Sequence, residues 1–309
     1  MICPDVLNSW TSSPGGSLLT VTPHPRILDT WDLQPHLDRS AELRTDMDVL
    51  DRLWPSAKVL VVDREGRFEA ASDPAAGGAF EPDRHIFLGR ADGTGWFAMR
   101  GEVGETASTL RDQAIDSPER ETATLAVALL AWHDRARFCE RCGHSTHLVT
   151  AGFARRCDGC GAENFPRTDP AVIVAVVDAD DRLLLAHQVS WPEGRASLVA
   201  GFVEAGESAE HAVIREVLEE VGVRIDAMTF LASQPWPFPR SLMLGYTALG
   251  TGDVVPDGEE IEWGRWYSRD DLRQALASGE LLPPGAGSIA GRIISLWERG
   301  SLPRPGDLA

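Results

Sequence analysis

The stretch from residue 201 to residue 223, GFVEAGESAEHAVIREVLEEVGV, constrains the fold more than any other part of the sequence. A glycine-containing loop leads into a helix that we expect to begin near Ser208 and to end at Gly222, because glycine commonly terminates helices. Each helical residue advances by about 100°, so Glu216, Glu219 and Glu220 share one face. The neighbouring face is apolar and predicts packing against a sheet; it comprises Val213, Ile214, Val217, Leu218 and Val221.

Three carboxylates on one helical face repel one another, at a cost of roughly a few tenths of a kcal/mol per neighbouring pair. One interpretation is a solvated acidic face, which tolerates this cost. The other is a site for a hard divalent cation such as Mg²⁺, which binds one or two carboxylates together with substrate phosphates.

The spacing of the fixed residues favours the cation site. Gly201 is followed at set intervals by Glu207, Arg215–Glu216, Val217, Glu219–Glu220 and Gly222–Val223. This pattern resembles the signature of the Nudix hydrolases at every defined position. The resemblance implies hydrolysis of a nucleoside diphosphate linked to another group, with divalent metals held by Glu216, Glu219 and Glu220. One of these glutamates, or a water that they position, supplies the nucleophile in that family.

Four of the five cysteines form two pairs, Cys139-x-x-Cys142 and Cys157-x-x-Cys160, with 14 residues between them. Each pair is followed by a glycine, which suits a tight knuckle that points two thiolates at one ion. Paired knuckles predict a structural Zn²⁺ site with four thiolate ligands, one ion per subunit. Disulfides, which a reducing compartment disfavours, a redox CxxC pair and ligation by His144 or His147 are the alternatives. The fifth cysteine, Cys3, is expected to be an ordinary thiol.

Residues 233–241, SQPWPFPRS, carry the information about the substrate. A stiff connector or a PxxP ligand for a partner is one interpretation. The alternating prolines also predict an extended backbone that presents Trp236 and Phe238 as rigid aromatic faces. Nicotinamide or adenine would stack on these faces, while Gln234 and Ser241 would hydrogen-bond to the base or to the ribose.

This segment looks like the SQPWPFPxS signature of the NADH pyrophosphatase branch of the Nudix hydrolases, which also has a zinc ribbon before its catalytic domain. The resemblance spans residues 110–300. It implies that Mg²⁺ or Mn²⁺ is held by the main chain of Ala200 and by Glu216, Glu220 and Glu260, with Glu219 as a further ligand or the base. It implies dinucleotide contacts from Phe165, Phe202, Gln234, Pro235, Trp236, Pro237, Phe238, Pro239, Arg240, Ser241 and Ala290. The position of Phe165 is often Tyr in the branch, so a phenol hydroxyl is absent here.

Several residues are expected to support this site. We predict that Glu207 and Arg215 form an ion pair that braces the loop on the helix. Gly201 and Gly222 are expected to have structural roles, in the backbone of the loop and at the end of the helix. Arg111 lies near the predicted domain junction, where it could reach a phosphate; a surface ion pair is the alternative.

The pattern of elements predicts three parts. Residues 1–115 contain two hairpins, 58–63 with 67–70 and 85–90 with 96–99, and indicate a small, mostly-β domain. Residues 116–164 comprise a helix that starts at Ser117-Pro118-Glu119 and the four-cysteine ribbon. In this helix we expect Leu125, Leu129 and Trp132 to pack and His133 to lie at the surface. Residues 165–309 place strands on both sides of one long helix, which predicts an α/β fold, the α/β/α sandwich with a mixed sheet of Nudix enzymes.

Charge and hydropathy limit the partners. The net charge of −18 provides no basic field for long nucleic acid. No apolar run is long enough to cross a bilayer, and the N-terminus lacks a secretory signal pattern. We therefore expect a cytoplasmic protein that does not associate with membranes.

The branch implies hydrolysis of NAD(H) to AMP and nicotinamide mononucleotide, and removal of NAD caps from RNA 5′ ends. It also implies a homodimer. One alternative is a Nudix hydrolase for another nucleoside diphosphate derivative such as ADP-ribose. The other is a regulator whose Nudix domain senses a nucleotide while the zinc ribbon binds nucleic acid.

Overall fold

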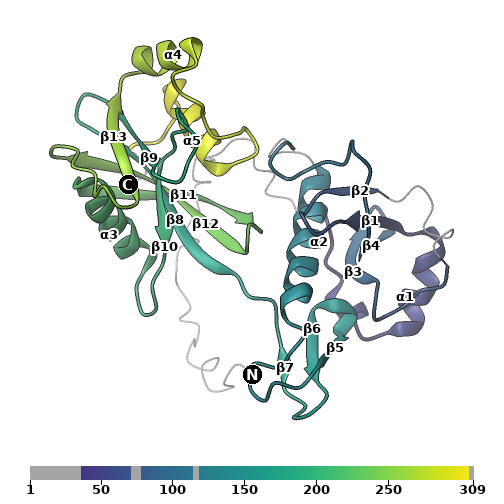
Figure 1. Cartoon of the computed structure of the whole chain (residues 1–309). Helices are drawn as coiled ribbons and strands as arrows, with labels where there is room; N and C mark the ends of the chain where they lie inside the picture. Colours follow the sequence, from purple (N-terminus) through teal and green to yellow (C-terminus); the bar gives the residue numbers. More distant parts are fainter. Residues whose placement is uncertain (1–35, 71–77, 114–117, 306–309) are drawn as a thin grey trace, which may run out of the picture.

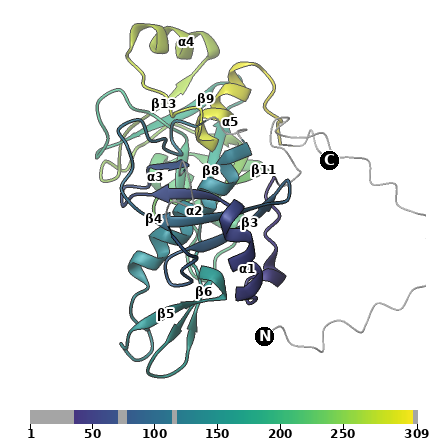
Figure 2. The ribbon, with the colours of Figure 1, turned by 90° about the vertical axis from the view of Figure 1, so that its right-hand side faces the viewer.

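A computed structural model of the chain describes residues 36–70, 78–113 and 118–305. Two lobes are visible in Figure 1: a smaller one built from the N-terminal third and a larger one built from residue 169 onward. In both views the cysteine-containing strands lie at the opposite end of the molecule from α4 (Figures 1 and 2). Cys3 and Ser117 fall outside the described residues. Within the described ranges, no helix has the length and apolar character needed to cross a membrane.

The smaller lobe is a four-stranded sheet in the order β2-β1-β4-β3. Its strands are β1 (Lys58–Val62), β2 (Phe68–Ala70), β3 (Ile86–Ala91) and β4 (Thr94–Arg100). Both predicted hairpins are confirmed, because β1 pairs with β2 and β3 with β4 in antiparallel fashion. Helix α1 (Met47–Leu53) packs on one face of this sheet through Leu50.

Helix α2 (Pro118–Arg135) covers the other face of that sheet. Its residues Ala123, Ala126 and Leu130 share one apolar core with Leu60 and Val62 of β1. The helix is therefore part of this core as well as the connection to the next domain. Leu125 and Leu129 are buried as expected, and Trp132 is partly buried.

The surface position expected for His133 is wrong. The residue is 8% exposed, and its Nε2 atom lies 2.8 Å from the carbonyl oxygen of Gly152. Burial lowers the pKa of His133 to about 4. The ring therefore ties α2 to the cysteine-containing segment in its neutral form.

That segment is a small sheet, β5 (Thr146–Val149), β6 (Ala154–Cys157) and β7 (Glu163–Asn164). The chain then enters the larger lobe, a sheet in the order β11-β12-β8-β9-β13, with β10 pairing to β8. The strands are β8 (Asp169–Val177), β9 (Leu183–Gln188), β10 (Val199–Phe202), β11 (Arg224–Trp236), β12 (Ser241–Thr251) and β13 (Ile261–Tyr267). Since β12 is parallel to β8 and β10 antiparallel, the sheet is mixed.

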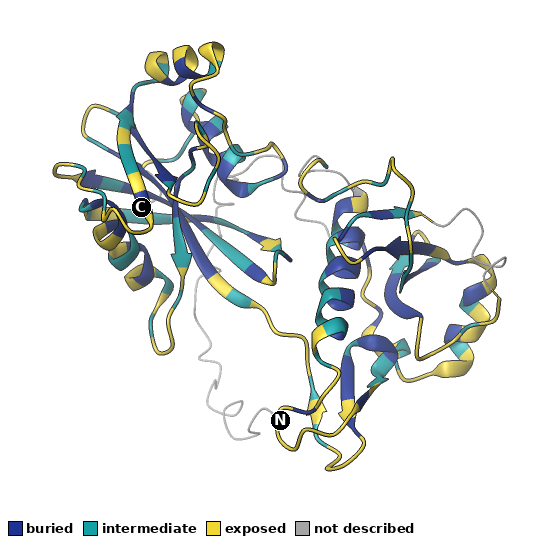
Figure 3. Cartoon of the chain, viewed as in Figure 1, coloured by how far each residue is buried: buried dark blue, intermediate teal, exposed yellow. Residues whose placement is uncertain are grey.

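Alternate residues of β8 enter two different cores. Ile173, Ala175 and Val177 pack with α4 (Arg269–Ser278) and α5 (Ile289–Glu298). Val172 and Val174 pack with α3 (Ala209–Val221) on the opposite face. Successive strand residues point to opposite faces of a sheet. This sheet is therefore covered by helices on both sides. Figure 3 shows its buried strands between partly exposed helices. The predicted α/β/α sandwich with a mixed sheet is confirmed.

Helix α3 has the predicted ends, with Ser208 as its N-cap and Gly222 as its C-cap at a φ of 71°. Val213, Val217 and Val221 are fully buried. The expectation that Ile214 and Leu218 also face the sheet is wrong, because they are 41% and 49% exposed. Each is about 100° round the helix from a buried valine, beyond the edge of the stripe that meets the strands.

The extended conformation expected for residues 233–241 is confirmed for residues 233–236, which lie in β11, and is wrong for the turn at residues 237–240. Strand β11 continues to Trp236, the chain turns, and β12 begins at Ser241, so that Trp236 and Ser241 are paired across a hairpin. Cross-strand pairing replaces the polyproline conformation that the alternating prolines favour. Trp236 and Phe238 still lie together, with ring centroids 5.3 Å apart in an edge-on arrangement.

The two lobes meet through Arg120 of α2, a buried arginine. One guanidinium nitrogen donates to the carbonyl oxygens of Leu110 and Gln113, at 2.6 and 2.8 Å. The other donates across the junction to the carbonyl oxygen of Gly287, at 2.7 Å. Gly287 lacks a side chain where one would collide, since a Cβ atom there would lie 2.6 Å from the Gln113 carbonyl oxygen. The smaller lobe is thereby fixed to the loop before α5.

Candidate active site

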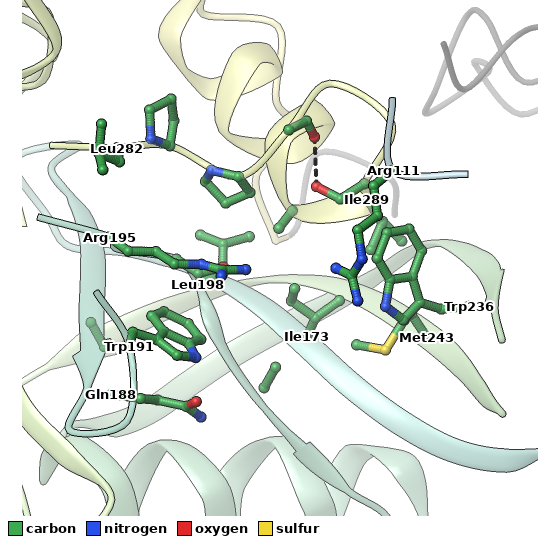
Figure 4. Close-up of a pocket in the computed structure, with 18 of the residues that line it drawn as sticks. Arg111, Ile173, Gln188, Trp191, Arg195, Leu198, Trp236, Met243, Leu282 and Ile289 are labelled. Carbon is green, nitrogen blue, oxygen red and sulfur yellow. Dashed lines mark hydrogen bonds between the residues drawn. The ribbon is translucent and has the colours of Figure 1, made fainter. Parts of the chain in front are cut away.

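A cavity of about 760 Å³ opens between the larger sheet, the loop after β9 and the segment before α5 (Figure 4). Of the residues predicted to form the site, it is lined by Arg111, Ala200, Glu220, Gln234, Trp236 and Ala290. Its volume falls in the range of small-molecule sites. The sequence motifs of α3, β11 and α5 therefore converge on one cavity, and the smaller lobe contributes Arg111.

The predicted acidic residues differ in their surroundings. Glu220 is 5% exposed and reaches the cavity, whereas the Glu219 side chain is 63% exposed and lies 3.2 Å from Arg215. The Glu216 side chain is largely buried. Glu260 is exposed and accepts a hydrogen bond from Nε2 of Gln188 at 3.1 Å, which holds it near the mouth of the cavity.

The electrostatics show that Glu220 lacks a compensating charge. Burial, together with the negative charge of Glu260 and Glu216, raises the pKa of Glu220 to about 8. Burial also raises the pKa of Glu216. A carboxyl group of this kind is held in the neutral form near pH 7 unless a cation approaches it. The arrangement is suited to binding divalent cations, which require the ionised form.

Arg215 braces the loop before α3 as predicted. Its guanidinium donates to both carboxylate oxygens of Glu207 at 2.9 Å and to the carbonyl oxygen of Phe202 at 3.0 Å. Hydrogen bonding to Arg215 lowers the pKa of Glu207 to about 2. Arg215 also contacts Glu216 at 2.9 Å, so the loop and the acidic face of α3 are fixed by one side chain.

Gly201 makes room for the carboxylate of Glu216. A Cβ atom at position 201 would lie 2.0 Å from the carboxyl carbon of Glu216. The Gly201→Ala variant should therefore displace this carboxylate and lower kcat about tenfold, because small misplacements of reacting groups are costly. Steady-state kinetics at saturating Mg²⁺ measure the effect.

The matched control is Gly206→Ala in the same loop. No atom lies within 4 Å of a Cβ atom there, although the φ of +86° makes the substitution strained. This variant should lose stability but keep kcat. Equal kcat values for the two variants would show that the space beside Gly201 has no role in positioning Glu216.

Trp236 forms one end of the cavity with Arg111. The guanidinium carbon of Arg111 lies 5.2 Å from the centroid of the Trp236 ring and 4.6 Å from that of Phe238. The structure shows a cation–π contact in place of the alternative surface ion pair: among the described residues, Arg111 has no carboxylate partner. Its charge is available to a ligand.

The side-chain amide of Gln234 forms hydrogen bonds with two backbone groups of the protein. Its Nε2 atom donates to the carbonyl oxygen of Gly287 at 3.0 Å, and its Oε1 atom accepts from the backbone N–H of Ile289 at 2.7 Å. Gln234 thereby fixes the start of α5 and with it Ala290, and its predicted hydrogen bond to the base or ribose stays a prediction.

The other predicted substrate contacts lie outside the cavity wall of a single chain. Phe165 and Phe202 are 60% and 54% exposed. Arg240 forms an ion pair with Asp169 at 2.6 Å, which accounts for its charge. Pro237, Phe238 and Pro239 lie in the turn of the β11–β12 hairpin, Ser241 is buried at the start of β12, and Pro235 is an exposed residue of β11.

One wall of the cavity was not predicted from the sequence. It comes from the connection between β9 and β10 and includes Gln188, Trp191, Pro192 and Arg195 (Figure 4). The segment Leu282–Pro284 faces it. A tryptophan and an arginine four residues apart in a loop, WPEGR, are the signal that could have drawn attention to it.

The four predicted cysteines form a compact cluster, with all four Sγ atoms within 4.8 Å of one another. The Sγ atoms of Cys139 and Cys160 are 3.8 Å apart, and those of Cys142 and Cys157 are 3.4 Å apart. A tetrahedral zinc with Zn–S distances of about 2.3 Å requires Sγ separations of about 3.8 Å. The backbone N–H of Cys160 donates to Sγ of Cys157 at 3.4 Å. The cluster therefore fits a zinc ion.

The chain is similar in sequence to proteins of known family. The NUDIX domain family model matches residues 167–283. The chain is 42% identical over 288 residues to the NAD-capped RNA hydrolase NudC of Mycobacterium bovis, covering 84% of this chain and 92% of that protein. It is 38% identical over 197 residues to the human NAD-capped RNA hydrolase NUDT12, covering 59% and 42%. A NUDIX hydrolase structure from Nitrosomonas europaea is similar at a TM-score of 0.43 and 18% identity, covering 55% and 94%.

Proposed function

The chain belongs to the NADH pyrophosphatase branch of the Nudix hydrolases, and on that premise we propose how its residues divide the work. The enzyme hydrolyses the pyrophosphate of NAD(H) to AMP and nicotinamide mononucleotide, and it removes NAD caps from RNA 5′ ends. The observation that carries this assignment is the cavity itself, in which Glu220 lies in one wall together with the stacking residue Trp236.

Glu216, Glu220, Glu260 and the main chain of Ala200 form the metal site in this proposal, with Mg²⁺ or Mn²⁺ as the ion. When bound, divalent ions neutralise the diphosphate and lower the pKa of an attacking water. The buried carboxyl of Glu220 must release its proton for this, and the raised pKa supports that role. Glu219, whose side chain is 63% exposed, serves as a further ligand or as the base.

The substrate is a dinucleotide with a negatively charged diphosphate. Arg111 offers a positive charge without an ion-pair partner among the described residues, and Trp236 offers an aromatic face beside it. Ala290 closes the wall behind them. We propose that one base stacks on Trp236 while Arg111 faces a phosphate.

Four cysteine thiolates hold a structural Zn²⁺ in this proposal. Thiolate ligands persist in a reducing compartment, and we propose a cytoplasmic location for the protein. The homodimer is retained as part of the proposal, because Phe165 and Phe202, both in the predicted catalytic domain, expose large apolar side chains. Light scattering measures the mass, and a monomer at assay concentration would contradict this part.

The function is tested by product analysis with NADH, NAD⁺, ADP-ribose and an NAD-capped RNA in Mg²⁺ or Mn²⁺. We expect AMP and nicotinamide mononucleotide from the first two, and 5′-monophosphorylated RNA from the last. A clear preference for ADP-ribose over both forms of NAD would favour the alternative Nudix activity.

A further inference from the structure

Two arginine–tryptophan pairs lie in the wall of the cavity. Arg111 and Trp236 are one pair, and Arg195 and Trp191 are the other, with the guanidinium carbon of Arg195 5.0 Å from the centroid of the Trp191 ring. Figure 4 shows the two pairs on opposite sides of the cavity, separated by Ile173. The first pair spans the two lobes, whereas the second is contained in one loop.

The loop that carries Trp191 and Arg195 is held in place by the structure around it. The carbonyl oxygen of Arg195 lies 2.6 Å from Nδ1 of His187, and the His187 ring stacks on Trp263 at 5.4 Å. The backbone N–H of Leu282 donates to Gly194 at 2.8 Å. An added Cβ atom at Gly194 would lie 2.8 Å from the carbonyl oxygen of Glu280. The pair is therefore presented on a packed support.

The charge of Arg195 is not used within the described parts of the chain. No carboxylate there forms an ion pair with it, although the whole chain carries a net charge of −18. By contrast, Arg265 has a similar contact with Trp263 at 5.0 Å and lies near Glu280, and it does not line the cavity. A solvent-accessible arginine without a partner, stacked on an indole in a ligand cavity, is available for an anionic ligand with an aromatic ring.

We propose that Trp191 and Arg195 form a second nucleoside site, which takes the half of the dinucleotide that does not stack on Trp236. The base stacks on the Trp191 indole, and the Arg195 guanidinium faces the phosphate of that half. This inference rests on the proposed function, because it assumes a substrate with two nucleosides joined by a diphosphate. It explains why Glu220 lies in the same cavity as both aromatic platforms.

The test compares Trp191→Ala and Trp236→Ala on three substrates: NAD⁺, ADP-ribose, which lacks nicotinamide, and an NAD⁺ analogue whose second ribose carries no adenine. Removing a stacking platform should lower kcat/KM for NAD⁺ about tenfold. On the substrate that lacks the base bound by the substituted tryptophan, each variant should have the same kcat/KM as the unsubstituted enzyme. We expect the loss of kcat/KM in Trp191→Ala to require one of the two bases and the loss in Trp236→Ala to require the other.

Two results would overturn the proposal. One is a Trp191→Ala variant with unchanged kcat/KM on NAD⁺, or with the same penalty on all three substrates. The other is that both substitutions lower kcat/KM only on substrates that carry the same base. This result would leave a single nucleoside site. If the unsubstituted enzyme cleaves none of the three substrates, the proposed function itself fails, and this result is distinct from the other two.

Matched variants separate stacking and charge from folding. Trp191→Phe keeps an aromatic face and should restore most of kcat/KM. Arg195→Ala should lower kcat/KM on all substrates that keep the diphosphate, whereas Arg265→Ala, which removes a similar contact outside the cavity, should leave it unchanged. Thermal midpoints of all variants should lie close together, because both arginines and the Trp191 platform border solvent.

Discussion

Replacement of Glu220 by Gln lowers kcat for NADH by about a hundredfold or more while the protein stays folded. Glutamine fills the same space in the cavity wall but carries no charge, so cation binding and water activation fail together. Initial rates over a range of Mg²⁺ and Mn²⁺ concentrations measure the loss. Because the missing group is the ligand itself, raising the metal concentration should not restore turnover.

The same substitution should stabilise the metal-free protein near pH 8. The pKa of Glu220 is about 8 in the folded state, above its ordinary value of 4.5. A raised pKa means that the folded protein holds a proton that the unfolded chain releases, so stability is greatest below about pH 4.5 and falls as the pH rises towards 8. Glutamine removes this pH dependence, which changes the free energy of unfolding by on the order of a few kcal/mol. Thermal unfolding in EDTA between pH 5 and pH 8 measures it.

The control is Glu210→Gln in the first turn of α3. Glu210 accepts a hydrogen bond from Tyr246 at 3.1 Å and does not line the cavity. Its replacement should change neither kcat nor the pH dependence of stability by much. Near-normal turnover of the Glu220→Gln variant would remove the physical basis of the metal site proposed here.

Replacement of Cys142 by Ser should reduce the affinity for zinc by about a hundredfold. Structural zinc sites bind with roughly 10–16 kcal/mol, and one of four thiolates supplies about a quarter of it. The purified variant should contain little zinc and unfold at a temperature several degrees lower. Elemental analysis and thermal unfolding measure these changes. Below the unfolding temperature kcat should be retained, because none of the four cysteines of the cluster lines the cavity.

Cys3→Ser is the matched control, because it removes a thiol outside the predicted cluster. It should leave zinc content and unfolding temperature unchanged. A Cys142→Ser variant with one zinc per chain and normal stability would show that the other thiols, or a histidine such as His144, complete the ligand set without it.

The parts of this molecule that were predicted correctly depend on local signals. The ends of α3 follow from Ser208 and Gly222, and the cysteine cluster follows from two short spacings that any folded ribbon would bring together. The ion pair of Glu207 and Arg215 likewise joins residues of one loop and the helix after it. Such features need only a few neighbouring residues to form.

The features that were missed depend on contacts between distant segments. Strand pairing, which aligns Trp236 with Ser241, overrides the local preference of the prolines. The positions of Trp191 and Arg195 in the cavity wall arise because the β9–β10 loop meets the segment at Leu282. His133 is buried only because the cysteine-containing sheet folds back onto α2. No periodicity or spacing in the sequence encodes which loops meet across a cavity.

The hydrogen bonds of the Gly287 carbonyl oxygen affect how this protein can be divided. It accepts from Arg120 of the smaller lobe and from Gln234 of the catalytic sheet, and Gln234 in turn holds the first N–H of α5. A fragment that begins after the cysteine-containing sheet would keep the Glu-rich helix yet lose both Arg120 and Arg111. The N-terminal third is therefore a structural component of the catalytic compartment, and a truncated protein is an unsuitable substitute for the full chain in inhibitor screening.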